Sequence, residues 1–99
     1  MNQEIKIAEI QIIPVKPKDG LVAFASFVLD EKYYIGSVAI FTRRDGFGYR
    51  LVYPTKKVGL TNINIFHPIN ARVGQAIEKA VIEKINDLFN ENIYGPAEN

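Results

Sequence analysis

The stretch LVAFASFVL, residues 21–29, carries apolar side chains on both of the faces that alternate along a strand. A strand with one wet face alternates between apolar and polar residues, so this continuous run predicts a central strand covered above and below. A short polar connection occupies residues 30–32, and β-branched and aromatic residues fill 33–42. The second segment therefore predicts another strand.

Residues 4–15 predict the strand that precedes this pair, and the turn residues Pro17-Lys18-Asp19-Gly20 end it. The apolar positions of this strand change phase between Ile7 and Ile10. Because side chains alternate strictly along a regular strand, such a slip predicts either a bulge near Ala8-Glu9 or a strand that begins there.

On the other side of the central pair, Arg43-Arg44-Asp45-Gly46 predicts a hairpin turn, since Asp-Gly readily adopts positive φ angles. Residues 49–53 predict a fourth strand, which Pro54 halts. We expect a polar loop at 55–59 and a fifth, weaker strand at 60–66.

A helix follows. Asn70 is a favoured N-cap, because its side-chain oxygen can accept a hydrogen bond from a free amide of the first turn. Apolar residues then recur every three or four positions, which is typical of one buried helical stripe. The stripe consists of Val73, Ile77, Val81, Ile85 and Leu88. Because Tyr94-Gly95-Pro96 is unsuited to a helix, we expect the helix to fade near Asn90 and the tail 91–99 to be frayed.

These elements predict an α+β fold, an antiparallel sheet of four to five strands followed by one C-terminal α-helix. The chain has 99 residues, which fits a single domain over 1–99 with its core at about 5–90. One helix covers one face of the sheet, so we expect a second copy or another partner to cover part of the other face. A homodimer is the simplest such assembly.

The composition restricts the class of function. The chain contains no cysteine, so disulfides and thiolate metal sites are excluded. No signal-peptide pattern or membrane-spanning apolar run is present, from which we expect a cytoplasmic protein that does not enter a membrane. The net charge is only +1, so any binding of nucleic acid has to depend on local clusters of lysine and arginine.

Four landmarks resemble a known family. Residues 23–30 read AFASFVLD, Pro54-Thr55-Lys56-Lys57 is similar to a P-S-[KR]-[KR] loop, and His67-Pro68-Ile69-Asn70 matches an H-P-I-N signature before a helix. Their order and spacing resemble the stage V sporulation protein G (SpoVG) septation regulators over about residues 7–88. The resemblance implies a small dimeric protein that binds DNA, and in some cases RNA, and influences gene expression and septum formation.

The chain resembles a divergent member of this family. Family members often carry extra arginines in the first strand and a basic tail. Here residues 9–13 read EIQII, and no lysine or arginine follows Lys84.

Six basic residues are candidates for contact with nucleic acid. Lys56 and Lys57 could each neutralise a phosphate, although a solvated surface loop would look the same. Arg72 falls in the first helical turn, where a phosphate would meet free amides and a guanidinium together; an ion pair with a local carboxylate is the alternative. Arg43, Arg44 and Arg50 could extend this surface, or form a plain polar hairpin.

Aromatic residues accompany these arginines. Phe47, Tyr49 and Tyr53 could stack on unpaired bases, although a core or dimer-surface role is more usual. His67 is the only histidine, and no further ligands stand at metal-binding spacing, so we expect a structural role for the His67–Asn70 signature, no metal and no cofactor. No catalytic constellation is present, so we expect no enzyme.

Two functions remain open at this point. The first is a dimeric regulator that binds nucleic acid through the six basic residues. The second is a protein-interaction adaptor, in which the apolar sheet face or an edge strand binds a division or regulatory protein without direct nucleic-acid contact.

Overall fold

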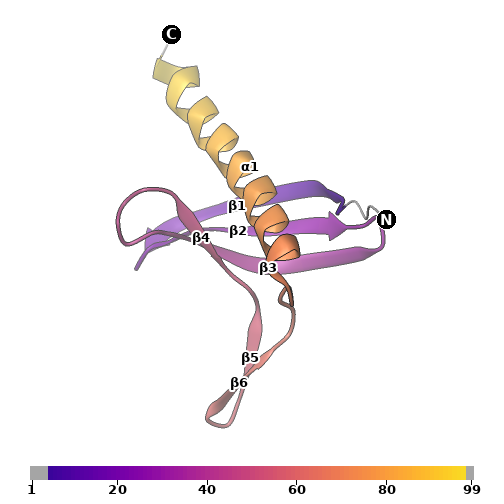
Figure 1. Cartoon of the computed structure of the whole chain (residues 1–99). Helices are drawn as coiled ribbons and strands as arrows, with labels where there is room; N and C mark the ends of the chain where they lie inside the picture. Colours follow the sequence, from indigo (N-terminus) through magenta and orange to yellow (C-terminus); the bar gives the residue numbers. More distant parts are fainter. Residues whose placement is uncertain (1–4, 98–99) are drawn as a thin grey trace.

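A computed structural model describes residues 5–97, with side chains described for residues 5–89. Four antiparallel strands form one sheet in the order β1-β2-β3-β4, and β5 pairs with β6 in a separate two-stranded sheet. The elements are β1 (Ile7–Lys18), β2 (Leu21–Leu29), β3 (Tyr33–Thr42), β4 (Tyr49–Val52), β5 (Thr55–Val58), β6 (Thr61–Asn64) and α1 (Ala71–Ala97) (Figure 1). The predicted α+β class is confirmed.

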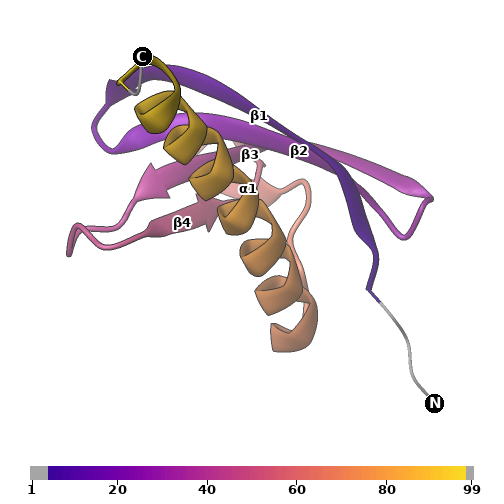
Figure 2. The same ribbon diagram turned by 90° about the horizontal axis from the view of Figure 1, so that it is seen from above.

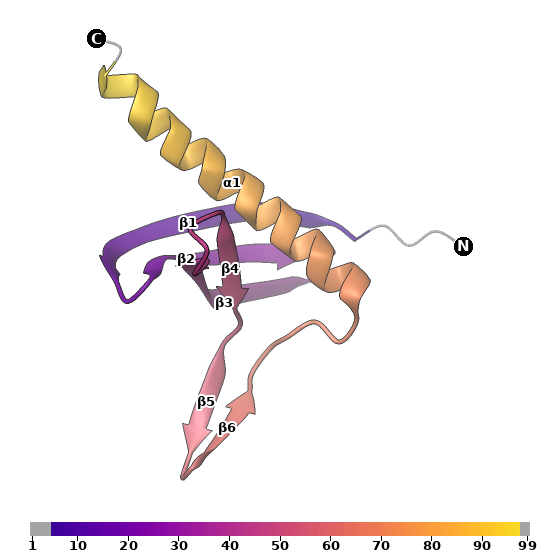
Figure 3. The same ribbon diagram turned by 60° about the vertical axis from the view of Figure 1, so that its left-hand side comes forward.

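Strand β2 is central, as its sequence predicts, and it pairs with β1 on one side and β3 on the other. Its side chains Ala23, Ala25 and Phe27 are buried beneath the helix. The expectation of cover on both faces is wrong within one chain, because the single helix lies on one side of the sheet only (Figures 2 and 3). Phe24 and Val28, on the opposite face, remain partly exposed.

Bulges flank β2 at neighbouring positions. The register of β1 against β2 shifts between Ala8 and Gln11, and Glu9 has a φ of 51°, so the bulge predicted from the phase change is confirmed. A second bulge in β3 places Gly36 and Ser37 opposite Ser26, with Ser37 at a φ of 61°. Because a bulge increases local twist, the two together bend the sheet around its helix.

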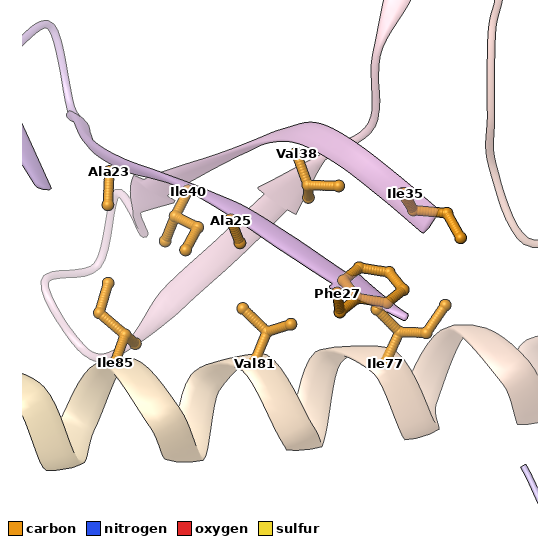
Figure 4. Close-up of a cluster of buried hydrophobic side chains, with 9 residues drawn as sticks. All are labelled: Ala23, Ala25, Phe27, Ile35, Val38, Ile40, Ile77, Val81 and Ile85. Carbon is orange, nitrogen blue, oxygen red and sulfur yellow. The ribbon is translucent and has the colours of Figure 1, made fainter. Parts of the chain in front are cut away.

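The core lies between the sheet and α1. Ile77, Val81 and Ile85 are fully buried and face the strands, as the helical stripe predicts (Figure 4). Each such aliphatic side chain contributes ~1.5–3 kcal/mol through removal from water. Phe27 and Ile40 are the largest side chains that meet them from the sheet.

The segment expected as a polar loop, 55–59, is a strand, so that expectation is wrong. Thr55–Val58 pairs with Thr61–Asn64 around the two-residue connection Gly59-Leu60. Gly59 has a φ of 62° at the first loop position, where a type II′ hairpin takes glycine. The resulting ribbon, β5–β6, extends from the sheet on the side opposite α1 (Figures 1 and 3), and we call it the arm.

The helix is longer than its sequence predicts. It extends to Ala97, so the expected end near Asn90 is wrong. The fraying expected for the tail 91–99 stays a prediction. Pro96 falls in the last turn, so the hydrogen bond that its missing amide removes lies at the very end of the helix. The tail residues 98–99 lie outside the described part of the chain. No helix within residues 5–97 is both long and apolar enough to cross a bilayer.

Candidate nucleic-acid interface

The arm has two chemically different faces. Directly paired residues share a face of an antiparallel ribbon, so the pairs Thr55–Asn64 and Lys57–Asn62 lie together on one side. This polar face carries hydroxyl, amide and ammonium groups only. The pairs Lys56–Ile63 and Val58–Thr61 form the other face, where Val58 and Ile63 are each 50% exposed.

The arm is also basic. Residues 55–64 include Lys56 and Lys57 and contain no aspartate or glutamate. Both lysines are exposed, and because neighbouring strand residues point to opposite faces, Lys57 belongs to the polar face and Lys56 to the apolar one. The two ammonium groups therefore lie on opposite sides of the ribbon. An irregular loop, which the sequence predicted, would not fix the relative directions of the two side chains.

The His67–Asn70 segment forms the entry to α1. The side-chain oxygen of Asn70 accepts a hydrogen bond from the amide of Val73 at 3.0 Å, which confirms the predicted N-cap. The ring of Pro68 lies against the helix start, since a Cβ added at Gly74 would meet its Cγ at 3.5 Å. His67 Nδ1 lies 3.0 Å from the carbonyl oxygen of Pro68. Ile69 differs from these three, because its side chain is 88% exposed.

Arg72 is exposed in the first turn of α1, where no acidic residue stands. Arg72 and the two arm lysines, candidates for the same surface, do not form a compact cluster. Lys56 and Lys57 lie on an arm that leads away from the helix start (Figures 1 and 3).

Arg43, Arg44 and Arg50 gather at the β3–β4 hairpin, around a shallow cavity of about 420 Å³ that Asp45 also lines. Arg43 Nε lies 3.5 Å from Asp45 Oδ2, and the Arg50 guanidinium lies over the Phe41 ring, 4.8 Å from its centre. These three arginines form a second basic region at the end of the sheet, separate from the arm (Figure 1).

Two of the three aromatic candidates belong to the core. The rings of Tyr49 and Phe89 are 6.3 Å apart, and those of Tyr53 and Phe66 are 5.7 Å apart. Burial, with a smaller contribution from the negative charge of Glu78, raises the pKa of Tyr53 to about 12. The hydroxyl of Tyr53 is buried without a hydrogen-bond partner in the described structure. Phe47, in contrast, is 81% exposed.

Apolar surface is concentrated on the side of the sheet that carries the arm. On the uncovered sheet face, Ile13 is 58% and Tyr34 is 75% exposed. A neighbouring cavity of about 510 Å³ lies where the arm joins the sheet. Its lining is Leu29, Tyr33, Tyr34, Ile35, Gly36, Pro54, Ile65 and Phe66. At the arm's tip, Leu60 is fully exposed.

Within the described residues, no three histidine, cysteine, aspartate or glutamate side chains come together in a way that could hold a metal ion. The site residues that sequence reasoning missed are Asn62 and Asn64 on the arm. The signal for them was present in the glycine-led connection Gly59-Leu60 between two short alternating segments, which is typical of a two-residue hairpin.

The geometry defines a class, a small α+β protein with a curved sheet, one covering helix and a projecting basic ribbon. The sequence profile of the SpoVG family matches residues 5–87. The chain belongs to the SpoVG family.

Two relatives share this similarity, and both are named "Putative septation protein SpoVG". The protein from Treponema denticola is 29% identical over 80 residues, which cover 80% of this chain and 84% of the relative. The protein from Finegoldia magna is 30% identical over 86 residues, or 86% of this chain and 78% of the relative. The divergent membership predicted from the four landmarks is thereby confirmed.

Proposed function

We propose that this protein is a cytoplasmic regulator of gene expression or septation that acts as a homodimer and binds nucleic acid through its arm. Membership of the SpoVG family, whose two similar relatives carry septation in their names, supports the regulatory role. The single observation that carries nucleic-acid binding is the arm itself, a projecting ribbon that bears two lysines and no acidic residue.

A two-stranded ribbon has the right width to enter the major groove of duplex DNA. Lys57 on the polar face would meet phosphates, while Asn62 and Asn64 beside it present amides of the kind that pair with adenine edges. Lys56 lies on the apolar face of the ribbon, beside the surface that a second copy would cover, and its long side chain would reach a phosphate from the edge of that contact. Arg72 supplies a further contact at the helix start, with Arg43, Arg44 and Arg50 as outer contacts.

The homodimer rests on the apolar surface. Ile13 and Tyr34 on the uncovered sheet face are exposed, and so are Val58, Leu60 and Ile63 on the arm. The arm extends on the side of the sheet opposite α1 (Figure 3). A second copy related by a twofold axis would cover these surfaces reciprocally, and would hold two arms at a fixed spacing. Two arms double the number of phosphates that each complex contacts.

The salt dependence of duplex binding tests the proposal. If Lys56, Lys57 and Arg72 each meet one phosphate, a dimer neutralises up to six, and log K falls against log[salt] with a slope of about −5. The Lys56→Ala/Lys57→Ala protein should lower the slope magnitude by up to ~4 and bind all sequences more weakly. A Lys16→Ala/Lys18→Ala protein, changed at two exposed lysines of β1, is the matched control and should keep the wild-type slope. An unchanged slope in the arm variant would reject the arm as the phosphate contact.

The dimer is tested separately by light scattering. Wild type should have twice the chain mass at tens of micromolar. Ile63→Lys, which places a charge on the apolar face of the arm, should reduce the mass to that of a monomer. Asn64→Lys, on the polar face, should leave the dimer intact. A wild-type monomer would remove this part of the proposal.

The exposed sheet face favours a second candidate, the protein-interaction adaptor. Ile13 and Tyr34 would then bind a division or regulatory protein in place of a second copy. This candidate takes precedence if wild type is monomeric and the arm lysines leave nucleic-acid binding unchanged.

A further inference from the structure

The tip of the β3–β4 hairpin carries an exposed aromatic ring on a turn whose backbone is fixed by hydrogen bonds. Phe47 lies between Gly46 and Gly48, whose φ angles are +83° and +94°. Its amide donates a hydrogen bond to the Asp45 carboxylate at 2.9 Å, and the Arg43 amide donates to the Gly48 carbonyl at 3.1 Å. The turn is therefore fixed by its own hydrogen bonds, while the Phe47 ring is 81% exposed.

The surroundings of this ring are charged. Three guanidinium groups and one carboxylate line the adjacent cavity of about 420 Å³, which leaves it with net positive charge. Arg43 is held by Asp45 and Arg50 by the face of Phe41. Among the described residues, Arg44 forms no salt bridge with a carboxylate. The site thus combines one unoccupied aromatic face with an unneutralised cation.

The pattern differs from that of a protein-docking surface. An aromatic anchor at a protein interface usually inserts into a pocket and is surrounded by apolar contacts that exclude water. Around Phe47, residues 43–46 and 48 are exposed arginine, aspartate and glycine, so no apolar rim is present. An aromatic ring beside arginines suits a ligand that alternates flat rings with negative charges.

We propose that this hairpin tip is a binding site for single-stranded nucleic acid, in which Phe47 stacks on one unpaired base and Arg44 holds the adjoining phosphate. A duplex keeps its bases stacked inside and offers Phe47 no free face, so the site selects unpaired strands. The inference deepens the proposed nucleic-acid binding and rests on it. It assigns unpaired bases to Phe47 at the hairpin tip and the duplex groove to the arm, which projects from a different part of the sheet, while the hairpin arginines contact phosphates in both kinds of ligand (Figure 1).

Fluorescence anisotropy against three labelled ligands tests this assignment: a short oligothymidylate, the matching oligouridylate and a duplex of the same length. Stacking of one base changes affinity by roughly 5- to 150-fold when the aromatic residue is replaced by alanine. Phe47→Ala should weaken single-strand binding within that range and change duplex binding less than about twofold. Phe47→Tyr keeps an aromatic face and should bind single strands within about twofold of wild type. Circular dichroism should show the same fold for both variants, since the ring is exposed.

Arg44→Ala supplies an independent readout. The salt slope on single strands should decrease in magnitude by about 0.7 for each phosphate that residue 44 no longer neutralises. Comparison of the oligothymidylate with the oligouridylate shows whether the ligand is DNA or RNA. Weaker binding of either strand by Phe47→Ala supports the site.

The outcomes separate this inference from the proposed function. If duplex binding depends on Lys56 and Lys57 while Phe47→Ala leaves single-strand binding unchanged, the hairpin site is rejected and the arm stands. Equal weakening of duplex and single strands by Phe47→Ala also rejects selection for unpaired bases. If wild type binds none of the three ligands, both proposals fail.

Discussion

The sheet–helix body and the arm are made of similar strands and tight turns, yet they bury very different amounts of side chain. In the body, Phe27, Ile40 and Ile77 are completely shielded from solvent. In the arm, every residue of Thr55–Val58 and Thr61–Asn64 is exposed. A two-stranded ribbon without a core is only marginally stable in water. The body therefore provides the folding free energy, and the arm depends on it.

This difference implies that stability and binding are carried by different residues. The arm is anchored at its base, where the amide of Ile65 donates to the carbonyl of Pro54 at 3.0 Å. Beyond that point its side chains contribute little to a single chain and remain available to a ligand or a second copy. Matched substitutions in the two regions test whether stability and binding are separate in this way.

The largest contrast is expected between two isoleucines. Ile77→Ala removes a fully buried side chain and should lower the free energy of unfolding by about 2–5 kcal/mol. Ile63→Ala, on the arm at 50% exposure, should lower it by less than ~1 kcal/mol. Urea unfolding, at concentrations where both variants have the same mass, measures the two values. Similar losses in the two variants would show that the side chains of the arm contribute to global stability as much as those of the core.

A smaller contrast is expected between two asparagines. Asn70 caps α1, so Asn70→Ala should lower the free energy of unfolding by about 1 kcal/mol. Asn62→Ala on the arm removes an exposed amide and should change it by less than ~0.5 kcal/mol. Thermal unfolding of the pair provides the test, and an equal shift in both would argue against a specific role for the cap.

Tyr53, between β4 and β5, connects the two regions and gives a pH-dependent effect. Its pKa is raised from 10.0 to about 12, so the folded state binds this proton more tightly than the unfolded state does. The contribution is complete below pH 10 and is lost as pH rises toward 12. Tyr53→Phe removes the unpaired hydroxyl, so it should be at least as stable as wild type at neutral pH. Its stability should also fall less steeply than that of wild type over this alkaline interval; parallel profiles would contradict the assignment.

The smallest stability effect is expected for single lysines. Lys57→Ala on the arm and Lys16→Ala on β1 should each change the free energy of unfolding by less than ~0.5 kcal/mol. Of these two variants, Lys57→Ala should weaken duplex binding and Lys16→Ala should not. The loss in Lys57→Ala should also exceed that in Lys56→Ala, because Lys57 shares its face with Asn62 and Asn64. Parallel chemical denaturation and anisotropy titrations measure both quantities, and a binding loss in Lys16→Ala would place the interface on the body.

Periodicity was sufficient for the body because each of its signals is local. The two-sided run 21–29 predicts a central strand, the slip between Ile7 and Ile10 predicts a bulge, and the spacing of Ile77, Val81 and Ile85 predicts one buried helical face. The structure confirms all three. The second strand of the arm falls within the fifth strand predicted at 60–66, and that prediction is confirmed. The first strand was missed because residues 55–58 have no apolar alternation of their own. Lys56 and Lys57 read as a loop until their pairing with β6 is known.

The family, the class of fold, the cap at Asn70 and the candidate basic residues could all be predicted from the sequence, because they depend on residue type and short-range spacing. How these residues are grouped depends on the packing of the strands and the helix. Pairing of β5 with β6 places Lys56 and Lys57 on opposite faces, and the position of the arm separates both from Arg72. The same packing places the half-buried rings of Tyr49 and Tyr53 against Phe89 and Phe66, and it leaves Phe47 exposed. Strand pairing and burial depend on contacts between residues that are distant in sequence. A local pattern of residue types therefore does not specify which side of a sheet remains uncovered.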